Sequence, residues 1–327
     1  MRLIKTEDAV GHVLCHDMTQ IIKDQYKDAR FRKGHVVTEE DIPVLLSMGK
    51  EHLYVWEMTS GMVHENDAAE RLLALCGQEN MIRSGVKEGK IELKAACDGV
   101  FLVDSARLVA VNSQDEVMIA TRKGGMAVRE GDKLAGMRVI PLIIEEEKLR
   151  KAEQAAGDKP LLSLKPYVRK TACIVATGGE VKKGLIKDTF TPVVIDKLKT
   201  YGIETLEVVY SGDGVENVRD AVLTMREKKP DMILCTGGMS VDPDDNTPGG
   251  IKAAGANIIA YGAPVLPGAM FLLGYFDDGM PVMGLPGCVM YAGATVFDLV
   301  LPKIAADVPV TRADLAALGE GGLCLGC

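Results

Sequence analysis

The second half of the chain constrains the fold most, because continuous apolar segments alternate there with amphipathic ones. Apolar strands are predicted at 172–176, 203–210, 232–235 and 281–283, and amphipathic helices at 188–201 and 215–228. Strands that are apolar on both faces occur in parallel sheets covered by helices on both sides. We therefore predict a doubly wound, mostly parallel α/β domain over residues 165–310.

The first 60 residues predict a small α+β unit. Thr38 can cap a helix whose first turn is acidic, and Gly49 is expected to end that helix. A strand is predicted after it, at 52–56. No motif in residues 1–60 indicates a reaction.

Residues 61–150 predict a β-rich module. A short helix is expected at 64–77, capped by Asn66 and ended by Gly77. From 89 to 144, short alternating runs are separated by recurrent glycine turns, which is typical of short strands.

Two further segments separate or follow these regions. Residues 145–160 are charged and alanine-rich, so we predict a solvated helical linker that ends at Gly157, with a domain boundary there. Residues 311–327 are rich in glycine and predict a flexible tail. The tail holds Cys324 and Cys327, whose C-x-x-C spacing supplies half of the ligands that a metal site needs.

Composition excludes several classes of protein. The net charge is −8 and the pI is near 5.3, which argues against a nucleic-acid binder. No run of 18 apolar residues is present to span a membrane, and the N-terminus carries charges where a signal peptide would be apolar. Six of the eight cysteines are scattered singly among apolar neighbours, so we expect reduced thiols and a cytoplasmic location.

Glycine-rich turns follow three of the predicted strands, at 177–184, 236–240 and 284–287. Glycine lets backbone N–H groups approach a ligand closely, and a helix N-terminus adds a partial positive charge that suits phosphate. In parallel sheets of this kind, ligands lie beyond the carboxyl ends of the strands. The three turns together indicate an anionic, phosphate-bearing ligand.

Four aspartates accompany these turns: Asp213, Asp242, Asp244 and Asp245. Carboxylates and phosphates repel each other, so a metal ion normally lies between them, and one or two of these residues could hold Mg²⁺. The alternative is that Asp244 and Asp245 cap the short helix that begins near Thr247. The residues alone leave both interpretations open.

The same motifs resemble those of the molybdopterin-binding domain shared by MoeA, MogA and gephyrin-type proteins. The matching segments, in order, are TGGEVxxGxxxD at 177–188, GDGxE at 212–216, TGGxSxDxDDxTP at 236–248, PG at 267–268 and GLPG at 284–287. The resemblance covers under half of the chain. It implies an α/β domain that binds molybdopterin or its adenylylated form.

The resemblance also assigns roles to individual residues. It implies that Asp245 and Asp213 act in catalysis and hold Mg²⁺. The positions that match its ligand-binding motifs are Gly178, Gly179, Glu180, Asp188, Thr236, Gly237, Gly238, Ser240, Asp242, Pro267, Gly268, Gly284, Pro286 and Gly287.

Two positions depart from the pattern of the MoeA-type proteins. These usually carry a lysine where this chain has Ala269, and an asparagine where it has Cys288. A lysine would supply a point charge to an anionic group, which alanine cannot do. We interpret Cys288 as a small buried residue at the start of a helix from about residue 289, rather than as a reactive thiol.

Three functions are compatible with the resemblance. The first is an enzyme of molybdenum-cofactor biosynthesis, which either adenylylates the pterin with Mg-ATP or inserts molybdate. The second is a non-catalytic carrier or sensor of the cofactor, and the third is a nucleotide hydrolase of the CinA type. The ligands and partners that it implies are the pterin, ATP or AMP, a molybdoenzyme client and further copies of the chain.

Overall fold

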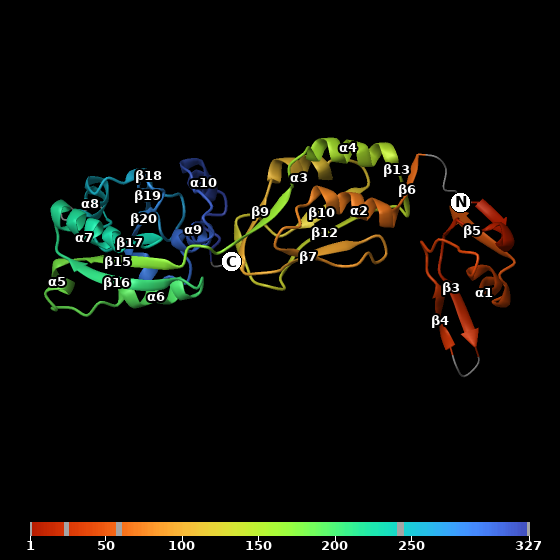
Figure 1. The fold of residues 1–327 in the computed structure, drawn as a ribbon, viewed down its shortest axis with the longest axis horizontal. Helices are drawn as coiled ribbons and strands as arrows, with labels where there is room; N and C mark the ends of the chain where they lie inside the picture. Colours follow the sequence, from red (N-terminus) through yellow and green to blue (C-terminus); the bar gives the residue numbers. More distant parts are fainter. Residues whose placement is uncertain (1, 23–25, 57–60, 241–244, 326–327) are drawn as a thin grey trace. The chain divides into compact units, whose positions relative to one another are not determined.

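The computed structural model describes residues 2–22, 26–56, 61–240 and 245–325 (Figure 1). Its contacts divide the chain into two compact units. Unit 1 comprises Met1–Cys97, Phe101–Gly124 and Arg129–Leu164, and unit 2 comprises Asp98–Val100, Gly125–Val128 and Lys165–Cys327. No helix in the described part of the chain is long and apolar enough to cross a membrane.

The N-terminal part of unit 1 is a small antiparallel sheet with one α-helix and a hairpin. The sheet has the order β1-β5-β2. The elements are β1 (Arg2–Lys5), η1 (Thr6–Asp8), β2 (Val13–Leu14), β3 (Met18–Ile22), β4 (Tyr26–Phe31), α1 (Asp41–Ser47) and β5 (His52–Trp56). The strand predicted at 52–56 is confirmed. The helix begins at Asp41, whose carboxylate accepts the N–H and O–H of Thr38, so the expected capping roles are reversed.

The rest of unit 1 combines short antiparallel strands with three helices. A four-stranded sheet has the order β10-β12-β8-β7. The elements are β6 (Met62–His64), α2 (Glu65–Leu75), β7 (Met81–Arg83), β8 (Ile91–Ala95), α3 (Ser105–Asn112), β10 (Val117–Thr121), β12 (Lys133–Val139), β13 (Ile143–Glu145) and α4 (Glu146–Ala156). Strands β11 (Met126–Val128), β9 (Gly99–Val103) and β14 (Leu162–Pro166) pair in another sheet.

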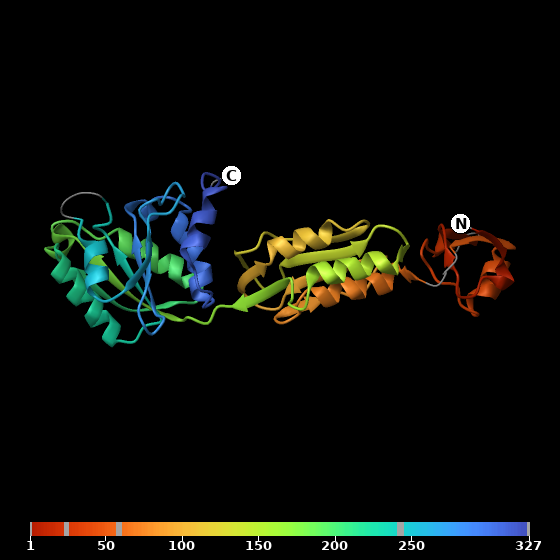
Figure 2. The same cartoon turned by 90° about the horizontal axis from the view of Figure 1, so that it is seen from above.

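Two helices of unit 1 differ from the sequence predictions. Helix α3 was not predicted; it begins after Asp104, whose carboxylate accepts the N–H of Arg107. Helix α4 ends at Gly157 as predicted, in a positive-φ conformation. It lies beside α2 (Figure 2), and Leu149 and Ala152 are fully buried. The helix is therefore a packed element of unit 1 rather than a solvated linker.

Helix α2 is capped by His64 and not by Asn66. The Nδ1 atom of His64 accepts the N–H of Asn66 at 3.2 Å. Its Nε2 atom lies 3.0 Å from the carbonyl oxygen of Gly34, so this nitrogen carries the proton and donates. Histidine is an uncommon N-cap, which explains why the capping rules selected the nearest asparagine instead.

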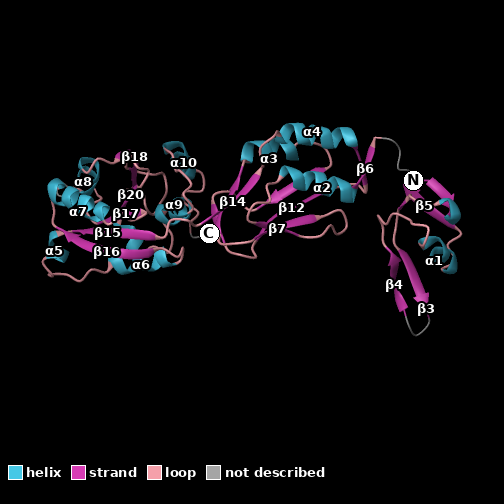
Figure 3. Ribbon diagram, viewed as in Figure 1, coloured by secondary structure: helices cyan, strands magenta, loops and turns pink. Residues whose placement is uncertain are grey.

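Unit 2 is built on a six-stranded mixed sheet with the order β16-β15-β17-β20-β19-β18 (Figures 1 and 3). The strands are β15 (Thr171–Thr177), β16 (Glu204–Ser211), β17 (Met232–Thr236), β18 (Asn257–Tyr261), β19 (Leu272–Tyr275) and β20 (Pro281–Leu285). The first three and β20 pair in parallel, whereas β19 and β18 are antiparallel. The mostly parallel sheet was predicted; β19, which pairs antiparallel with both of its neighbours, and the edge strand β18 were not.

Alternate residues of the central strand β15 belong to two separate cores. Ile174 packs with residues of α6 (Phe190–Lys199) and α9 (Val296–Ala305). Val175 packs instead with residues of α7 (Val215–Glu227) and α8 (Thr247–Ala253). Because neighbouring side chains of a strand point to opposite faces, helices cover both faces of this sheet.

The C-terminal elements of unit 2 correct two predictions. The helix expected from about residue 289 begins only at Val296, because Thr295 and Asp298 form a reciprocal capping box there. A short 3₁₀ turn, η2 (Gly287–Met290), precedes it. The start of the predicted flexible tail is helical, in α10 (Arg312–Ala316) and η3 (Ala317–Gly319), and Leu315 is buried in the core. Cys327 lies outside the described residues.

Candidate functional site

Three threonines connect the carboxyl ends of β15 and β17. The Thr177 hydroxyl donates to the carbonyl oxygen of Thr236 at 3.0 Å and lies 3.1 Å from the hydroxyl of Thr247. The Thr247 hydroxyl donates in turn to the carbonyl oxygen of Gly237 at 2.8 Å. Thr236 and Thr247 are buried. These bonds hold the turns that follow the two strands against the start of α8.

Gly237 and Gly238 occupy positions that no other residue could fill without strain. Their φ angles are +83° and +58°, in the region that L-residues avoid. A Cβ atom on Gly237 would lie 2.5 Å from the carbonyl oxygen of Thr177, and one on Gly238 would lie 2.7 Å from the hydroxyl of Thr247. The turn after β17 therefore presents bare backbone at this edge of the sheet.

The buried side chain of Met239 anchors the same turn. It packs against Gly284 of β20, where a Cβ atom would come within 2.5 Å of the methionine sulfur. The Tyr261 hydroxyl donates to the carbonyl oxygen of Met239 at 3.0 Å, with that of Ser240 at 3.3 Å. Gly284, predicted as a ligand contact, thus makes room for a side chain that anchors the turn.

The turn after β16 approaches the turn after β15. Gly179 donates its N–H to the carboxylate of Asp213, at 3.2 Å and 3.1 Å from the two oxygens. A Cβ atom on Gly179 would lie 2.6 Å from this carboxylate, so the close approach requires glycine. The Lys182 ammonium lies near Gly212, 3.8 Å from the position that a Cβ would take there. A positive charge is therefore available beside these turns.

Asp188 caps helix α6. One of its oxygens accepts the N–H groups of Phe190 and Thr191, at 2.9 Å and 3.0 Å. Burial raises the pKa of this carboxyl, but the hydrogen bonds from Thr191 and Phe190 outweigh burial and hold the pKa below its ordinary value. Its other oxygen is buried and receives no hydrogen bond from the described residues.

Asp245 lies just before α8, and one of its oxygens is also buried without a hydrogen-bond donor among the described residues. The charge of Asp245 acts on Tyr261. Burial raises the pKa of the Tyr261 phenol, and the negative charge of Asp245 raises it further. A buried carboxylate oxygen without a donor is costly unless a ligand or cation completes it. Asp245 therefore shares with Asp188 a buried carboxylate oxygen that the described residues leave unbonded.

The predicted metal ligands do not form a cluster of three. Within the described ranges, no three His, Cys, Asp or Glu side chains are arranged to hold a metal ion. Asp213 is already bonded to Gly179, whereas Asp245 has an oxygen to offer. Asp242 and Asp244 lie outside the described residues. This donor set therefore fits a cation held by Asp245 together with oxygens of a bound ligand.

Other residues that were predicted to bind the ligand lie beside α9, at η2 and in α5. Gly268 has a φ of +123° and closely approaches α9, where a Cβ atom would lie 2.9 Å from the side chain of Val296. Pro267, before it, lies in the same segment, and Pro286 and Gly287 lead into η2. Glu180 is exposed in the short helix α5 (Gly179–Lys182).

Cys288 follows Gly287 in η2 and is half-buried. Burial raises the pKa of its thiol, although backbone hydrogen bonds act in the opposite direction. The raised pKa agrees with the interpretation of Cys288 as a packed residue and not a reactive thiolate.

Sequence reasoning missed Tyr261, Met239 and the roles of Thr177 and Thr247. Both threonines stand within the motifs, as the first residue of TGGEV and the residue before Pro248, so motif position alone could have drawn attention to them. Tyr261 belongs to an antiparallel strand that was not predicted, and no local signal connects it with the turn after β17.

Bare glycine turns at the carboxyl edge of a largely parallel sheet define an α/β domain of the kind that binds its ligand at that edge. Residues 173–306 match the family model described as a probable molybdopterin binding domain. This part of the chain therefore belongs to the molybdopterin-binding domain superfamily, as the motifs predicted. Residues 3–57 match a second model, described as a domain of unknown function (DUF8806).

Curated relatives match a shorter stretch. A CinA-like protein of Mycobacterium tuberculosis is 33% identical over 76 residues, which cover 23% of this chain and 18% of the relative. A CinA-like protein of Petrotoga mobilis is 32% identical over 76 residues, which cover 23% and 19%. The chain thus matches less than a fifth of the length of these relatives.

Solved structures also match part of the chain. CinA from Thermoplasma acidophilum is 18% identical, with a TM-score of 0.35, and the match covers 42% of this chain and 98% of that one. MoaB, a molybdopterin biosynthesis enzyme from Thermus thermophilus, is 16% identical, with a TM-score of 0.37 and coverage of 44% and 99%.

Proposed function

We propose that unit 2 binds molybdopterin or its adenylylated form, with the phosphate against the turns after β15 and β17, and acts in molybdenum-cofactor biosynthesis. The observation that supports this most is the bare backbone of Gly237 and Gly238, held by buried threonines and by Met239. Backbone groups fixed in advance bind a phosphate without the entropy cost of ordering a loop. The match to the molybdopterin-binding family model supports the choice of pterin.

The surrounding side chains divide the work of binding. Gly178 and Gly179 bring the turn after β15 close to the ligand, and the Lys182 ammonium adds positive charge near Gly212. Met239 and Tyr261 keep the turn after β17 in place. The proposed chemistry, phosphoryl-type transfer by positioning and electrostatics, needs no nucleophile from these residues.

Asp245 would hold Mg²⁺, and the bound ion would supply charge neutralisation for adenylyl transfer. The carboxylate of Asp213 would act indirectly, by orienting Gly179 through their hydrogen bonds. The motifs assign the same role to both aspartates, whereas in this proposal Asp245 holds the cation and Asp213 orients the backbone.

Anaerobic calorimetry of the full chain with molybdopterin, followed by Mg-ATP, tests the proposal. Wild type should bind the pterin and form an adenylylated product that depends on Mg²⁺ and ATP. Asp245→Asn should remove product formation, whereas Asp158→Asn, a change at an exposed aspartate far from α8 in the sequence, should not. Pterin binding without ATP turnover would favour the carrier or sensor, and absence of pterin binding would contradict the proposal.

A second candidate is a nucleotide hydrolase of the CinA type. The curated matches favour it, since they are CinA-like proteins. This function would use the same turns for a nucleotide phosphate. Release of a nucleoside monophosphate from a dinucleotide by the full chain, without any pterin binding, would select it over the first candidate.

A further inference from the structure

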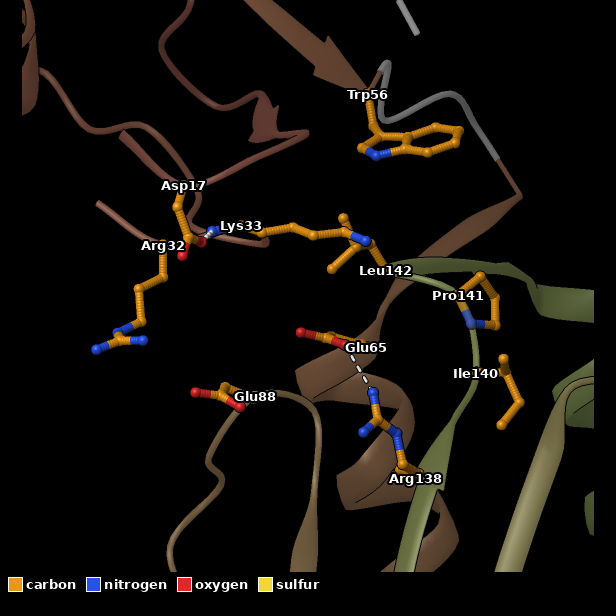
Figure 4. Close-up of a pocket in the computed structure, with 10 residues that line it drawn as sticks. All are labelled: Asp17, Arg32, Lys33, Trp56, Glu65, Glu88, Arg138, Ile140, Pro141 and Leu142. Atoms are coloured by element: carbon orange, nitrogen blue, oxygen red, sulfur yellow. Dashed lines mark hydrogen bonds and ion pairs between the residues drawn. The ribbon is translucent and has the colours of Figure 1, made fainter. Parts of the chain in front are cut away.

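Unit 1 contains a pocket that the proposed function does not use. Its volume is about 390 Å³, and its lining comes from the N-terminal part of the unit and from α2, β12 and the turns beside them. The lining residues are Asp17, Arg32, Lys33, Trp56, Glu65, Glu88, Arg138, Ile140, Pro141 and Leu142 (Figure 4). It therefore combines one aromatic wall, three apolar residues and six charged ones.

Glu65 lies in the floor of the pocket and is almost completely buried. Its side chain is 6% exposed, and the nearest cation is the Arg138 guanidinium at 3.8 Å. Gly34 and Gly89 pack directly against it, and a Cβ atom on Gly89 would lie 2.6 Å from its carboxylate. Burial raises the pKa of Glu65 above its ordinary value. The Glu65 carboxyl group is therefore protonated more readily than an exposed glutamate.

One hydrogen-bond donor of the pocket is buried without an acceptor among the described residues. The indole N–H of Trp56 is buried and makes no hydrogen bond to the described residues, and its nitrogen lies on the edge of the ring that faces Lys33 (Figure 4). The Lys33 side chain extends into the pocket between Trp56 and Glu65 (Figure 4). A buried donor without an acceptor destabilises the empty pocket, so a ligand that brings an acceptor is stabilised here.

Two donors of the pocket suit an anionic ligand. Asp17 accepts the backbone N–H of Lys33 at 2.7 Å, and Glu65 lies 3.8 Å from the Arg138 guanidinium. The Lys33 ammonium and the indole N–H of Trp56 are therefore the groups that an acceptor of a ligand can meet. Trp56, Pro141 and Leu142 supply an apolar surface beside these charges, which suits a ligand with an apolar body.

We propose that this pocket binds a small organic anion, whose carboxylate contacts Lys33, Arg138 and the indole N–H of Trp56, and whose apolar body lies against Trp56 and Pro141. The site is separate from the glycine turns of unit 2, and it gives the N-terminal part of the chain a ligand of its own. The proposal does not depend on what unit 2 binds.

Binding should become tighter as the pH falls. An anion beside Glu65 repels the ionised carboxylate, so the protonated form of Glu65 binds it better. The other groups that act on Glu65 are His64, Arg138, Glu88 and Lys33. Glu65→Gln fixes the neutral form, and this variant should bind at neutral pH at least as tightly as wild type and lose most of the pH dependence.

The emission of Trp56 reports on the pocket directly, because the chain contains one tryptophan. The full chain would be titrated at constant ionic strength with benzoate, with its neutral isostere benzamide, and with inorganic phosphate. We expect benzoate to change the Trp56 emission with saturation, and benzamide to bind at least tenfold more weakly. Lys33→Gln should weaken benzoate binding at least tenfold, whereas Lys151→Gln, at an exposed position of α4, should bind as wild type does.

Three results would overturn the proposal. A response to benzoate without saturation would show that no such site exists. Equal affinities of Lys33→Gln and Lys151→Gln would show that Lys33 does not contact the carboxylate. Saturation by phosphate but not by benzoate would replace the organic ligand by an inorganic anion.

Discussion

Replacing Gly237 by alanine should destabilise unit 2 more than the same change at a glycine with open surroundings. Gly255, just after α8, has a φ of +92° and no atom within 4 Å of the position that a Cβ would take, so it is the matched control. Both substitutions force an L-residue into the left-handed region, at a cost of about 1–2 kcal/mol. Only Gly237→Ala adds a collision with the backbone carbonyl of Thr177, at 2.5 Å.

The collision cannot be relieved by a side-chain rotation, because the atom that it meets belongs to the backbone of β15. Overpacking of this kind costs about 1–3 kcal/mol more. For a domain of this size, each kcal/mol lowers the melting temperature by about 2–4 °C, so Gly237→Ala should melt roughly 2–12 °C below Gly255→Ala. Differential scanning calorimetry of the two variants measures the difference. Equal melting temperatures would refute the inference that the turn after β17 has no room for a side chain.

Three further changes test the packing of unit 2. Met239→Ala removes a buried side chain that lies against Gly284 and should cost about 2–5 kcal/mol, measured by urea unfolding; a cost below that range would show that the turn is not anchored there. Thr295→Ala removes the capping box of α9 and should cost about 1 kcal/mol in the same assay, and no loss would contradict the assigned cap. The pKa of Asp188 lies below its ordinary value, so its ionised form stabilises the fold above about pH 4, and this contribution disappears as the pH falls through the lowered pKa. Asp188→Asn should therefore unfold more easily at neutral pH and show a shallower loss of stability in acid, and an unchanged acid profile would count against the cap.

Periodicity was sufficient to predict the central part of unit 2. The strands β15, β17 and β20 are apolar runs, the edge strand β16 is partly apolar, and the helices α6 and α7 carry apolar residues at helical spacing. Such patterns depend only on local sequence and on burial on both faces. Strands β18 and β19 were missed because no helix separates them, so the alternation of strands with amphipathic helices did not reveal them.

The candidate site was predicted in part. The glycine turns were found because positive φ angles and close backbone approach both favour glycine, and glycines are visible in the sequence itself. The contacts that fix them were not found: Met239 fills the space above Gly284, and Tyr261 reaches the turn from a distant strand. These contacts join residues far apart in the chain, and a single sequence carries no local signal for them.

The first 150 residues show the same limit. Helix α3 has one start signal, the Asp104 cap. This signal was overlooked because recurrent glycine turns surround the helix and indicate short strands. The pocket around Glu65 depends on several short segments that are spread along the chain from Asp17 to Leu142. No motif marks it, since its charged residues are of common types and its apolar residues are few.

The role of the glycine turns in holding a phosphate is tested most directly by comparing two ligands on the full chain. Anaerobic titration would give the dissociation constants of molybdopterin and of the same pterin after its phosphate has been removed. We predict that loss of the phosphate weakens binding by a factor of about a hundred, corresponding to roughly 2–3 kcal/mol of charge-assisted hydrogen bonds. Equal affinities for the two ligands would contradict this role of the turns.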